Sequence, residues 1–241
     1  MFYIIATPIG NLEDITLRAL RILQEVNYIL CEDTRVTAKL LAHYKIEKKK
    51  LIAYHHHTNE KKIKEIVELV KNNDVALVTD AGTPGISDPG NILIAEIQKK
   101  QEEQEKQEEQ EKGNTVVPIP GPCALISALS LSGLPTDKFI FKGFVPNKKG
   151  RETFLREVLA AEETVIYYDS PYRVIKNLEK IRDLFADIRD EFAKPKHLVV
   201  CRELTKKFET IYRGSAEEIL AEIKKEFHKG TPKGEFVIVV S

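Results

Sequence analysis

The chain has 241 residues, with 37 basic and 37 acidic side chains and a formal net charge of zero, which argues against an undirected binder of polyanions. Its hydrophobic content of 42% is ordinary for a globular protein, and no window approaches the roughly 20 consecutive apolar residues of a membrane span. The start also lacks the basic region of a signal peptide, so we expect a cytoplasmic protein with one large domain or two smaller ones.

The first half of the chain alternates short apolar runs with amphipathic stretches. Apolar runs of strand length occupy residues 2–6, 28–31, 51–54, 75–78 and 115–119. Between them, apolar residues recur at helical spacing in stretches that begin near residues 16, 35, 60 and 91. Continuous apolar strands separated by helices predict a parallel sheet that is covered on both faces.

Two segments in the middle of the chain break this alternation. Residues 101–112 read QEEQEK twice and have no apolar face, which predicts a solvated extension of the preceding helix. The stiff sequence PIPGP at 118–122 suits either a domain linker or a turn that shapes a ligand site. We place a domain boundary there, with an N-terminal domain of residues 1–117 and a C-terminal domain of residues 118–241.

The second half has a different mix of elements. Helices are predicted at 123–131, 152–161, 174–185 and 216–227, and strands at 139–144, 164–168, 197–201, 208–213 and 235–240. Close connections between strands occur only in this half, so its sheet should be mixed.

Four loops follow predicted strands in the first half, at 7–11, 32–35, 55–60 and 79–90, on the edge where open α/β sheets bind ligands. The last loop, TDAGTPGISDPG, combines three glycines with two prolines and permits close approach of a ligand to the backbone. It matches neither a dinucleotide fingerprint nor a phosphate-binding P-loop. In loop 32–35, Asp33 could simply cap a helix with Arg35 beside it, but the unusual neighbouring loops favour a functional site.

Two groups of residues suggest metal or redox chemistry at first sight. The run His55-His56-His57 lies where consecutive side chains point to alternating faces, and no second cluster has ligand spacing, so we expect no metal site. The three cysteines, Cys31, Cys123 and Cys201, show no Cys-x-x-Cys spacing. They are expected to be buried, reduced thiols.

Lysines alternate with aromatic residues between 138 and 151. This pattern fits phosphate contacts beside base stacking, and it fits equally a core strand whose solvent face is lysine. We favour the core for Phe139, Phe141 and Phe144, and expect contacts with a polyanion only from the loop Lys148-Lys149-Gly150-Arg151.

Seven segments, taken together, resemble the ribosomal RNA small subunit methyltransferase I family within the tetrapyrrole-methylase superfamily. The resemblance covers nearly the whole chain in order. The segments are ATPIGNLEDIT (6–16), CEDTR (31–35), TDAGTPGISDPG (79–90), PIPGPCA (118–124), GFVPNKKGR (143–151), RELTKKFE (202–209) and KGEFVIVV (233–240).

This resemblance implies two α/β domains with S-adenosylmethionine in the cleft between them, in a homodimer. It implies methylation of a cytidine ribose 2′-hydroxyl in the decoding region of 16S rRNA, so the partner would be 16S rRNA or the 30S subunit rather than DNA or a membrane. Two alternatives stay open. One is a tetrapyrrole or protein methyltransferase of the same fold, and the other is a non-catalytic RNA-binding assembly factor.

The resemblance also implies roles for particular residues. The cofactor would lie against Pro8, Ile9, Asp80, Ala81, Gly82, Thr83, Ile86, Cys123, Ala124, Tyr168 and Leu204. We nominate Asp33 as the proton acceptor, Arg35 and Lys206 as orienting or phosphate-binding groups, and Lys148, Lys149, Arg151 and Arg173 as RNA contacts. The chain departs from the family at Asp169, where Glu is more usual, and in the QEEQEK duplication.

Overall fold

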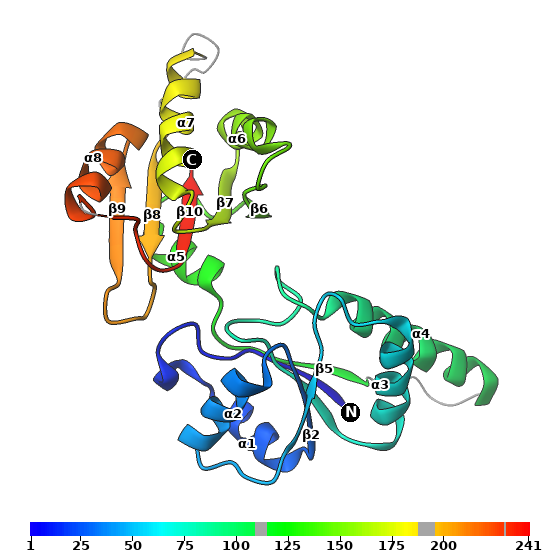
Figure 1. The fold of residues 1–241 in the computed structure, drawn as a ribbon. Helices are drawn as coiled ribbons and strands as arrows, with labels where there is room; N and C mark the ends of the chain where they lie inside the picture. The colour runs from blue at the N-terminus through cyan, green and yellow to red at the C-terminus, as the bar shows by residue number, and fades with distance from the viewer. Residues whose placement is uncertain (109–114, 188–195, 229) are drawn as a thin grey trace. The chain divides into compact units, whose positions relative to one another are not determined.

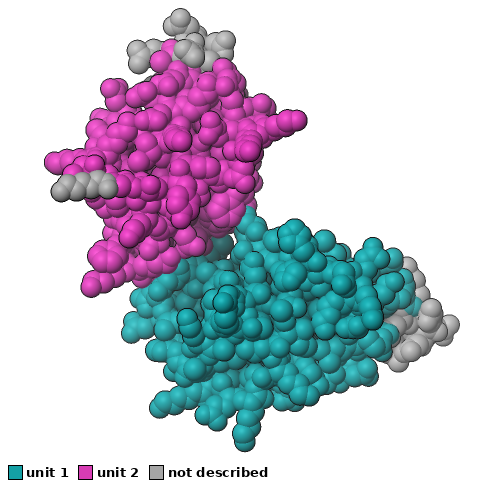
Figure 2. All heavy atoms as spheres, in the orientation of Figure 1, with its two compact units in different colours: residues 1–123 teal, residues 124–241 magenta. Residues whose placement is uncertain are grey.

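The computed structural model describes residues 1–108, 115–187, 196–228 and 230–241. The chain divides into two compact units, residues 1–123 and residues 124–241, which Figure 2 shows in different colours. Each unit has its own five-stranded sheet.

The sheet of the first unit is parallel throughout, with the strand order β3-β2-β4-β1-β5. Its strands are β1 (Phe2–Ile5), β2 (Tyr28–Cys31), β3 (Lys50–Ala53), β4 (Val75–Leu77) and β5 (Val116–Ile119). Its helices are the short 3₁₀ helix η1 (Leu12–Asp14) and the α-helices α1 (Leu17–Glu25), α2 (Thr34–His43), α3 (Glu60–Asn72) and α4 (Asn91–Glu108) (Figure 1). The predicted parallel sheet is confirmed.

Helices cover both faces of this sheet, and each face has its own apolar cluster. Ile22 of α1 and Leu41 of α2 belong to one cluster, whereas Ile66 of α3 and Leu93 of α4 belong to the other. Each such buried side chain contributes on the order of 1.5–3 kcal/mol of apolar burial.

Polar residues set the starts of these helices. The hydroxyl of Thr16 accepts a hydrogen bond from the main-chain N–H of Ala19 at the start of α1, and the amide oxygen of Asn59 accepts one from Lys62 at the start of α3. Both satisfy N–H groups that the helix itself leaves without a partner.

Helix α4 continues into the charged hexamer, as predicted, and is helical to Glu108. An ion pair of 2.6 Å joins Lys100 to Glu103 on its exposed surface. The rest of that prediction, residues 109–112, lies outside the described residues. None of the helices that the structure describes is long and apolar enough to cross a membrane.

The second unit has a mixed sheet with the order β6-β7-β10-β8-β9, in which only β6 and β7 are parallel. Its strands are β6 (Phe139–Phe144), β7 (Thr164–Asp169), β8 (Leu198–Arg202), β9 (Thr210–Gly214) and β10 (Phe236–Val240). Its helices are α5 (Ala124–Ser132), α6 (Arg151–Ala160), α7 (Val174–Asp187) and α8 (Ala216–Glu226) (Figure 1). The prediction of a mixed sheet is confirmed.

The prediction that the aromatic residues of β6 belong to the core is wrong. Phe139 is 40% exposed and Phe144 is 55% exposed, while Phe141 is half-buried. The reason is the position of β6 at the edge of the sheet, paired only with β7, together with a shift of register between Phe141 and Phe144. Alternation of aromatic and polar residues cannot tell an edge strand from a central one.

The cysteines are free thiols. Cys31 and Cys201 are buried, as predicted. The prediction is wrong for Cys123, which is half-buried because it lies in the connection between β5 and α5 and not in a strand of a sheet. Burial raises the pKa of Cys31 and raises that of Cys201 to about 12, so both remain protonated at neutral pH.

Candidate functional site

The carboxyl edge of the first sheet brings together loops that are far apart in the sequence. The loop after β1 and the loop after β4 are joined at Thr7 and Gly82, where the main-chain N–H of each residue donates to the carbonyl oxygen of the other, at 2.9 and 3.0 Å. The buried hydroxyl of Thr7 also donates to the carbonyl oxygen of Thr79, at 3.1 Å. Three hydrogen bonds therefore fix the start of the glycine-rich loop against the end of β1.

The loop after β5 joins the same assembly. The hydroxyl of Thr83 donates to the carbonyl oxygen of Pro122, at 3.1 Å. A Cβ atom added at Gly121 would lie 3.1 Å from the Cβ atom of Ala6, so the chain passes closely over the end of β1 at a position that suits glycine.

The glycine-rich loop takes a backbone path that ordinary residues rarely adopt. Gly82 and Gly85 have φ angles of 80° and 83°, and Ser87 has a φ of 64°. A side chain at Gly82 would be strained by this backbone and would meet the Cγ2 atom of Ile9 at 3.5 Å. Gly82 is itself buried beside Ile9, and its neighbours Ala81 and Thr83 are half-buried.

The loop after β2 is tied to the glycine-rich loop by an acidic residue. The main-chain N–H of Asp33 donates to Oδ1 of Asp80, at 3.0 Å. Asp33 also caps α2 by accepting from the main-chain N–H of Arg35 at 2.8 Å. Asp33 therefore caps α2 and also belongs to the joined loops. The interpretation of loop 32–35 as a helix cap and its interpretation as part of a functional site are compatible.

The carboxylate of Asp33 is held by Arg35. The guanidinium Nη2 of Arg35 donates to Oδ2 at 2.6 Å and its Nε donates to Oδ1 at 3.0 Å. These side-chain hydrogen bonds, followed by the main-chain hydrogen bond from Arg35, lower the pKa of Asp33 from 3.8 to about 2. Asp33 is therefore ionised at any pH near neutrality and is a weak proton acceptor.

Glu32, beside Asp33, is perturbed in the opposite direction. Burial and then the negative charge of Asp80 raise its pKa, while the nearby His56 and His55 act against this rise. Neighbouring carboxyl groups of the same loop thus differ in how readily they take up a proton.

The histidine run lies in the loop after β3 and is exposed. The main-chain N–H of His57 donates to Nδ1 of His55, at 3.2 Å, which is a local turn contact. Within the described ranges, no group of three or more His, Cys, Asp or Glu side chains has an arrangement that could hold a metal ion.

In the second unit, the carboxyl ends of β6, β7 and β8 lie at one edge of the sheet, because β6 is parallel to β7, and β7 and β8 both pair antiparallel with β10. Tyr168 of β7 is half-buried, and its ring contacts those of Phe141 and Phe144 at centroid distances of 5.1 and 5.2 Å. Leu204, after β8, is only 7% exposed.

Lys206 lies in the loop after β8 and is engaged by two carboxylates. Its ammonium donates to Glu203 at 2.9 Å and to Glu235 at 2.7 Å. Burial lowers its pKa, but the hydrogen bonds from its ammonium to Glu235 and Glu203 outweigh this and raise it overall. Lys206 therefore stays charged, as an orienting role requires. The loop is also strained, with φ angles of 51° at Glu203 and 66° at Thr205.

The basic residues nominated for RNA divide into two kinds. Lys148 and Lys149 are exposed. Arg173 is half-buried and braces two loops, because it donates to the carbonyl oxygen of Val145 at 2.9 Å and to the hydroxyl of Ser170 at 3.0 Å. Arg151 begins α6 and is close enough to Asp169 to lower the pKa of that carboxyl.

Asp169, at the position where the family resemblance leads us to expect Glu, is 3% exposed. It accepts from Asn177 Nδ2 at 2.7 Å and from the main-chain N–H of Ser170 at 2.8 Å. Burial raises its pKa, against the effect of these hydrogen bonds and of Arg173 and Arg151. The shorter side chain is thus held by a buried amide partner.

The structure gathers the first-unit candidates at one sheet edge. Pro8, Ile9, Asp80, Ala81, Gly82 and Thr83 lie in the joined loops after β1 and β4, whereas Ile86, further along, is 40% exposed. Cys123 ends the first unit, and Ala124, Tyr168 and Leu204 belong to the second.

The sequence alone indicated no role for Thr7, Thr79 or Asn177. Thr7 could have been identified from the sequence as a polar residue directly after an apolar strand. A hydroxyl buried at such a position needs an internal hydrogen-bond partner, which here is the carbonyl oxygen of Thr79.

Comparison with known proteins gives a consistent result. The family model for tetrapyrrole (corrin/porphyrin) methylases matches residues 1–220. The chain is 44% identical over 241 residues to ribosomal RNA small subunit methyltransferase I of Hydrogenobaculum sp. (strain Y04AAS1), a match that covers 99% of this chain and 94% of that protein. The protein of the same name from Escherichia coli O157:H7 is 42% identical over 240 residues, covering 99% of this chain and 76% of the relative.

Solved structures show the same fold at low identity. A uroporphyrin-III-C-methyltransferase from Thermus thermophilus aligns with a TM-score of 0.61 and 18% identity, covering 99% of this chain and 93% of that one. A diphthine synthase aligns with a TM-score of 0.66 and 14% identity, covering 100% and 89%. Because these two proteins carry different names, their likeness concerns the fold and not the substrate.

Proposed function

The chain belongs to the ribosomal RNA small subunit methyltransferase I family of the tetrapyrrole methylases, and we propose that it methylates the ribose 2′-hydroxyl of a cytidine in the decoding region of 16S rRNA. The observation that carries this proposal is similarity to relatives of that name over 99% of the chain. The proposed methyl donor is S-adenosylmethionine, and the proposed setting is a cytoplasmic homodimer acting on 16S rRNA or the 30S subunit.

The residues of the first unit fit this donor. The half-buried residues Ala81 and Thr83 lie on either side of the buried Gly82, in a loop that hydrogen bonds hold to Thr7. A loop that contains no lysine or arginine and has no phosphate-binding signature suits the amino-acid part of a sulfonium cofactor better than a nucleotide phosphate. We assign binding to Pro8, Ile9, Asp80, Ala81, Gly82, Thr83, Ile86 and Cys123 of the first unit, and to Ala124, Tyr168 and Leu204 of the second.

When bound, this cofactor supplies an electrophilic methyl group, and the protein has to align the ribose oxygen with it and remove a proton. We assign to Asp33 the role of accepting the proton of the ribose hydroxyl. A carboxylate with a pKa of about 2 accepts a proton only from a strongly acidic donor, and the ribose oxygen becomes one once its bond to the methyl carbon has formed. Proton transfer would therefore be late: the methyl carbon would leave the donor's sulfur, which becomes uncharged, as its bond to the ribose oxygen forms, and the O–H bond would then break towards Asp33.

Arg35 and Lys206 are assigned to orientation and phosphate contact. Arg35 fixes the direction of the Asp33 carboxylate through the hydrogen bonds between them, and its side chain is 85% exposed. Lys206 is held by Glu203 and Glu235, so its ammonium has a defined position. An arginine that both orients a carboxylate and faces solvent can also contact an RNA phosphate.

The proposed RNA contacts of the second unit are Lys148, Lys149, Arg151 and Arg173. Lys148 and Lys149 supply exposed ammonium groups for phosphates, whereas Arg173 holds the loops after β6 and β7 together. A 2′-hydroxyl target makes RNA the substrate and excludes DNA at the methylated position.

The proposal is tested by incubating the protein with S-adenosylmethionine labelled in its methyl group and with either 30S subunits that lack the modification or a precorrin-type macrocycle. We expect label in 16S rRNA and none in the macrocycle. Label in the macrocycle alone would overturn the proposal in favour of a tetrapyrrole methylase. Binding of 30S subunits without cofactor binding or methyl transfer would instead identify an assembly factor.

A further inference from the structure

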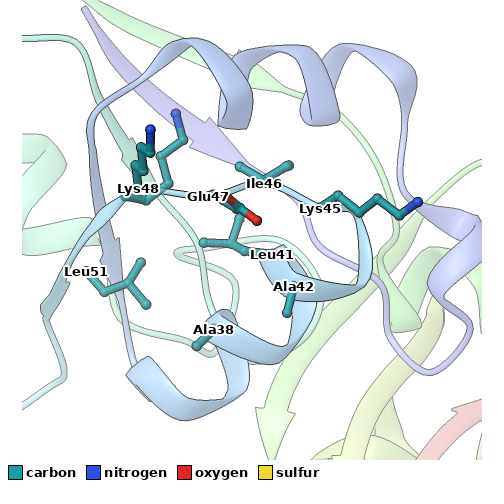
Figure 3. A pocket seen from close by; sticks show the side chains of 9 residues that line it. Ala38, Leu41, Ala42, Lys45, Ile46, Glu47, Lys48 and Leu51 are labelled. Carbon is teal, nitrogen blue, oxygen red and sulfur yellow. The ribbon is translucent and has the colours of Figure 1, made fainter.

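A lysine-rich loop between α2 and β3 forms the rim of a shallow cavity of about 340 Å³ in the first unit. The sequence there is KIEKKK, residues 45–50. Leu41, Ile46 and Leu51 contribute apolar lining, and Figure 3 shows Lys45 and Lys48 extending at opposite ends of the lined region. Nothing in the proposed function so far uses this feature.

Lys45 occupies a position that normally favours glycine. It follows the end of α2 with a φ of 56°, and its main-chain N–H donates to the carbonyl oxygen of Ala42 at 3.1 Å. The N–H of Ile46 donates to the carbonyl oxygen of Leu41 at 2.9 Å. This is the Schellman arrangement, in which the left-handed residue is usually glycine because any other side chain is strained.

Lys48, three residues later, also has left-handed backbone, with a φ of 58°. Two lysines in left-handed backbone, within one short loop, are uncommon. Strained residues of this kind are typical of functional sites, where the side chain contributes something other than stability.

The lysines of the loop have different surroundings. The ammonium of Lys49 donates to the carbonyl oxygens of Gln24 and Val26, at 2.6 and 2.7 Å, and Lys50 lies over the ring of Tyr28 at 5.1 Å. Lys45 and Lys48 are exposed, and neither ammonium forms a hydrogen bond or ion pair with any residue that the structure describes.

The exposed side of α2 links this loop to the candidate site. Arg35, Lys39 and His43 are exposed and four residues apart, so they follow one side of the helix. Arg35 binds Asp33 at the start of α2, and Lys45 follows its end. A helix of ten residues is about 15 Å long, so the cationic side chains of Arg35, Lys39 and Lys45 extend from the candidate site along the helix to the cavity.

We propose that Lys39, Lys45 and Lys48, which we call the α2 basic surface, contact backbone phosphates of the rRNA strand that carries the target nucleotide. The proposal rests on the proposed function and adds an RNA-binding surface on the first unit to the contacts assigned to the second. The partner follows from charge complementarity, because the only acidic residue of the cavity lining is Glu47, against Lys45, Lys48 and Lys49. The apolar lining leaves room for a sugar or base beside the phosphates.

The left-handed backbone offers a sharp test. In the variant Lys45→Gly/Lys48→Gly, two charges are removed while each position receives the residue that its backbone favours, so the melting temperature should stay the same or rise. The matched control is Lys61→Ala/Lys64→Ala, which removes two exposed lysines from α3 on the opposite face of the sheet. The variant Lys45→Arg/Lys48→Arg keeps the charge.

Binding to 30S subunits that lack the modification is measured across a range of salt concentrations, with methyl transfer by the unchanged protein measured alongside. For the glycine variant, we expect about a three- to tenfold weaker affinity and a salt slope smaller by roughly 1.4, because each phosphate contact to single-stranded RNA contributes roughly 0.7. The control and the arginine variant should bind like the unchanged protein.

If the unchanged protein binds and methylates the subunit but the glycine variant binds no more weakly than the α3 control, the α2 basic surface is refuted and the proposed function stands. If the unchanged protein neither binds nor methylates the subunit, both are refuted. Unaltered calorimetric binding of S-adenosylmethionine to the glycine variant is expected in either case, because both positions lie at the far end of α2 from the candidate site.

Discussion

The main-chain N–H of Asp33 donates a 3.0 Å hydrogen bond to the Oδ1 atom of Asp80. This contact joins two loops that are 47 residues apart in the sequence, and it gives Asp80 a structural purpose in addition to the cofactor contact that we propose. Loop 32–35 and the glycine-rich loop are therefore joined through Asp80.

Replacing Asp80 by Ala tests this coupling. Because the variant frees loop 32–35, we expect kcat/KM to fall on the order of tenfold to a hundredfold through misplacement of Asp33 and Arg35. The free energy of unfolding should change by only about 1 kcal/mol. The control Asp80→Asn keeps a side-chain oxygen acceptor and should retain most activity. Equal activity of the Ala and unchanged proteins would show that the coupling has no catalytic role.

Gly82→Val is expected to abolish binding of S-adenosylmethionine, as measured by calorimetry. Valine at a φ of 80° is strained by about 1–2 kcal/mol, and its side chain would fill the space beside Ile9. Gly133→Val is a matched control, because Gly133 has a φ of 72° but nothing within 4 Å of an added Cβ atom. If both variants bind the cofactor equally well, loop 79–90 is not the binding site.

The ion pair of Asp33 with Arg35 predicts a particular dependence of stability on pH. The folded pKa of Asp33, about 2, is lower than its ordinary value of 3.8. The contribution of the ion pair to stability is therefore fully present above about pH 4 and is lost as the pH falls towards 2. Asn is also a good helix cap, so Asp33→Asn removes the charge while keeping the cap.

Urea denaturation of the unchanged protein and of Asp33→Asn between pH 3 and pH 7 measures this contribution. We expect the unchanged protein to be the more stable above about pH 4, with the difference shrinking at lower pH. A difference that does not change with pH would mean that Arg35 does not perturb Asp33.

Alanine in place of Lys148, Lys149 and Arg151 should weaken binding to 30S subunits and reduce the salt slope by roughly 2, for three phosphate contacts. Affinity for S-adenosylmethionine should not change. Lys176→Ala/Lys225→Ala removes exposed lysines from α7 and α8 of the same unit and serves as the control. An unchanged slope would remove the loop after β6 from the RNA interface.

The sequence predicted the alternation of strands and helices well, because apolar runs and helical spacing record burial directly. The start of α1 at Thr16 and the parallel first sheet follow from such local signals. The exposure of Phe139 and Phe144 could not be predicted, because a strand's place at the edge of a sheet depends on pairing between distant segments.

In the candidate site, too, local features could be predicted from the sequence, whereas contacts between distant segments could not. Composition singled out the glycine-rich loop and Asp33, since glycine, proline and charge at strand ends are visible in the sequence. The hydrogen bonds of Thr7 with Thr79 and Gly82 could not be predicted, because they depend on the closeness of β1 and β4, which are adjacent in the sheet although β2 and β3 lie between them in the chain. The strained lysines at positions 45 and 48 were likewise hidden, because only backbone geometry reveals them.

The central claim is that the methyl group is placed on the 2′-oxygen of a cytidine in 16S rRNA. It is tested most directly by mass spectrometry of nuclease-digested 16S rRNA, after incubation of 30S subunits with the protein and S-adenosylmethionine. The account predicts one added methyl group on the ribose of a decoding-region cytidine, and none when the Gly82→Val protein is used. A methyl group on a base, or its absence from 16S rRNA in the presence of active, cofactor-bound protein, would contradict it.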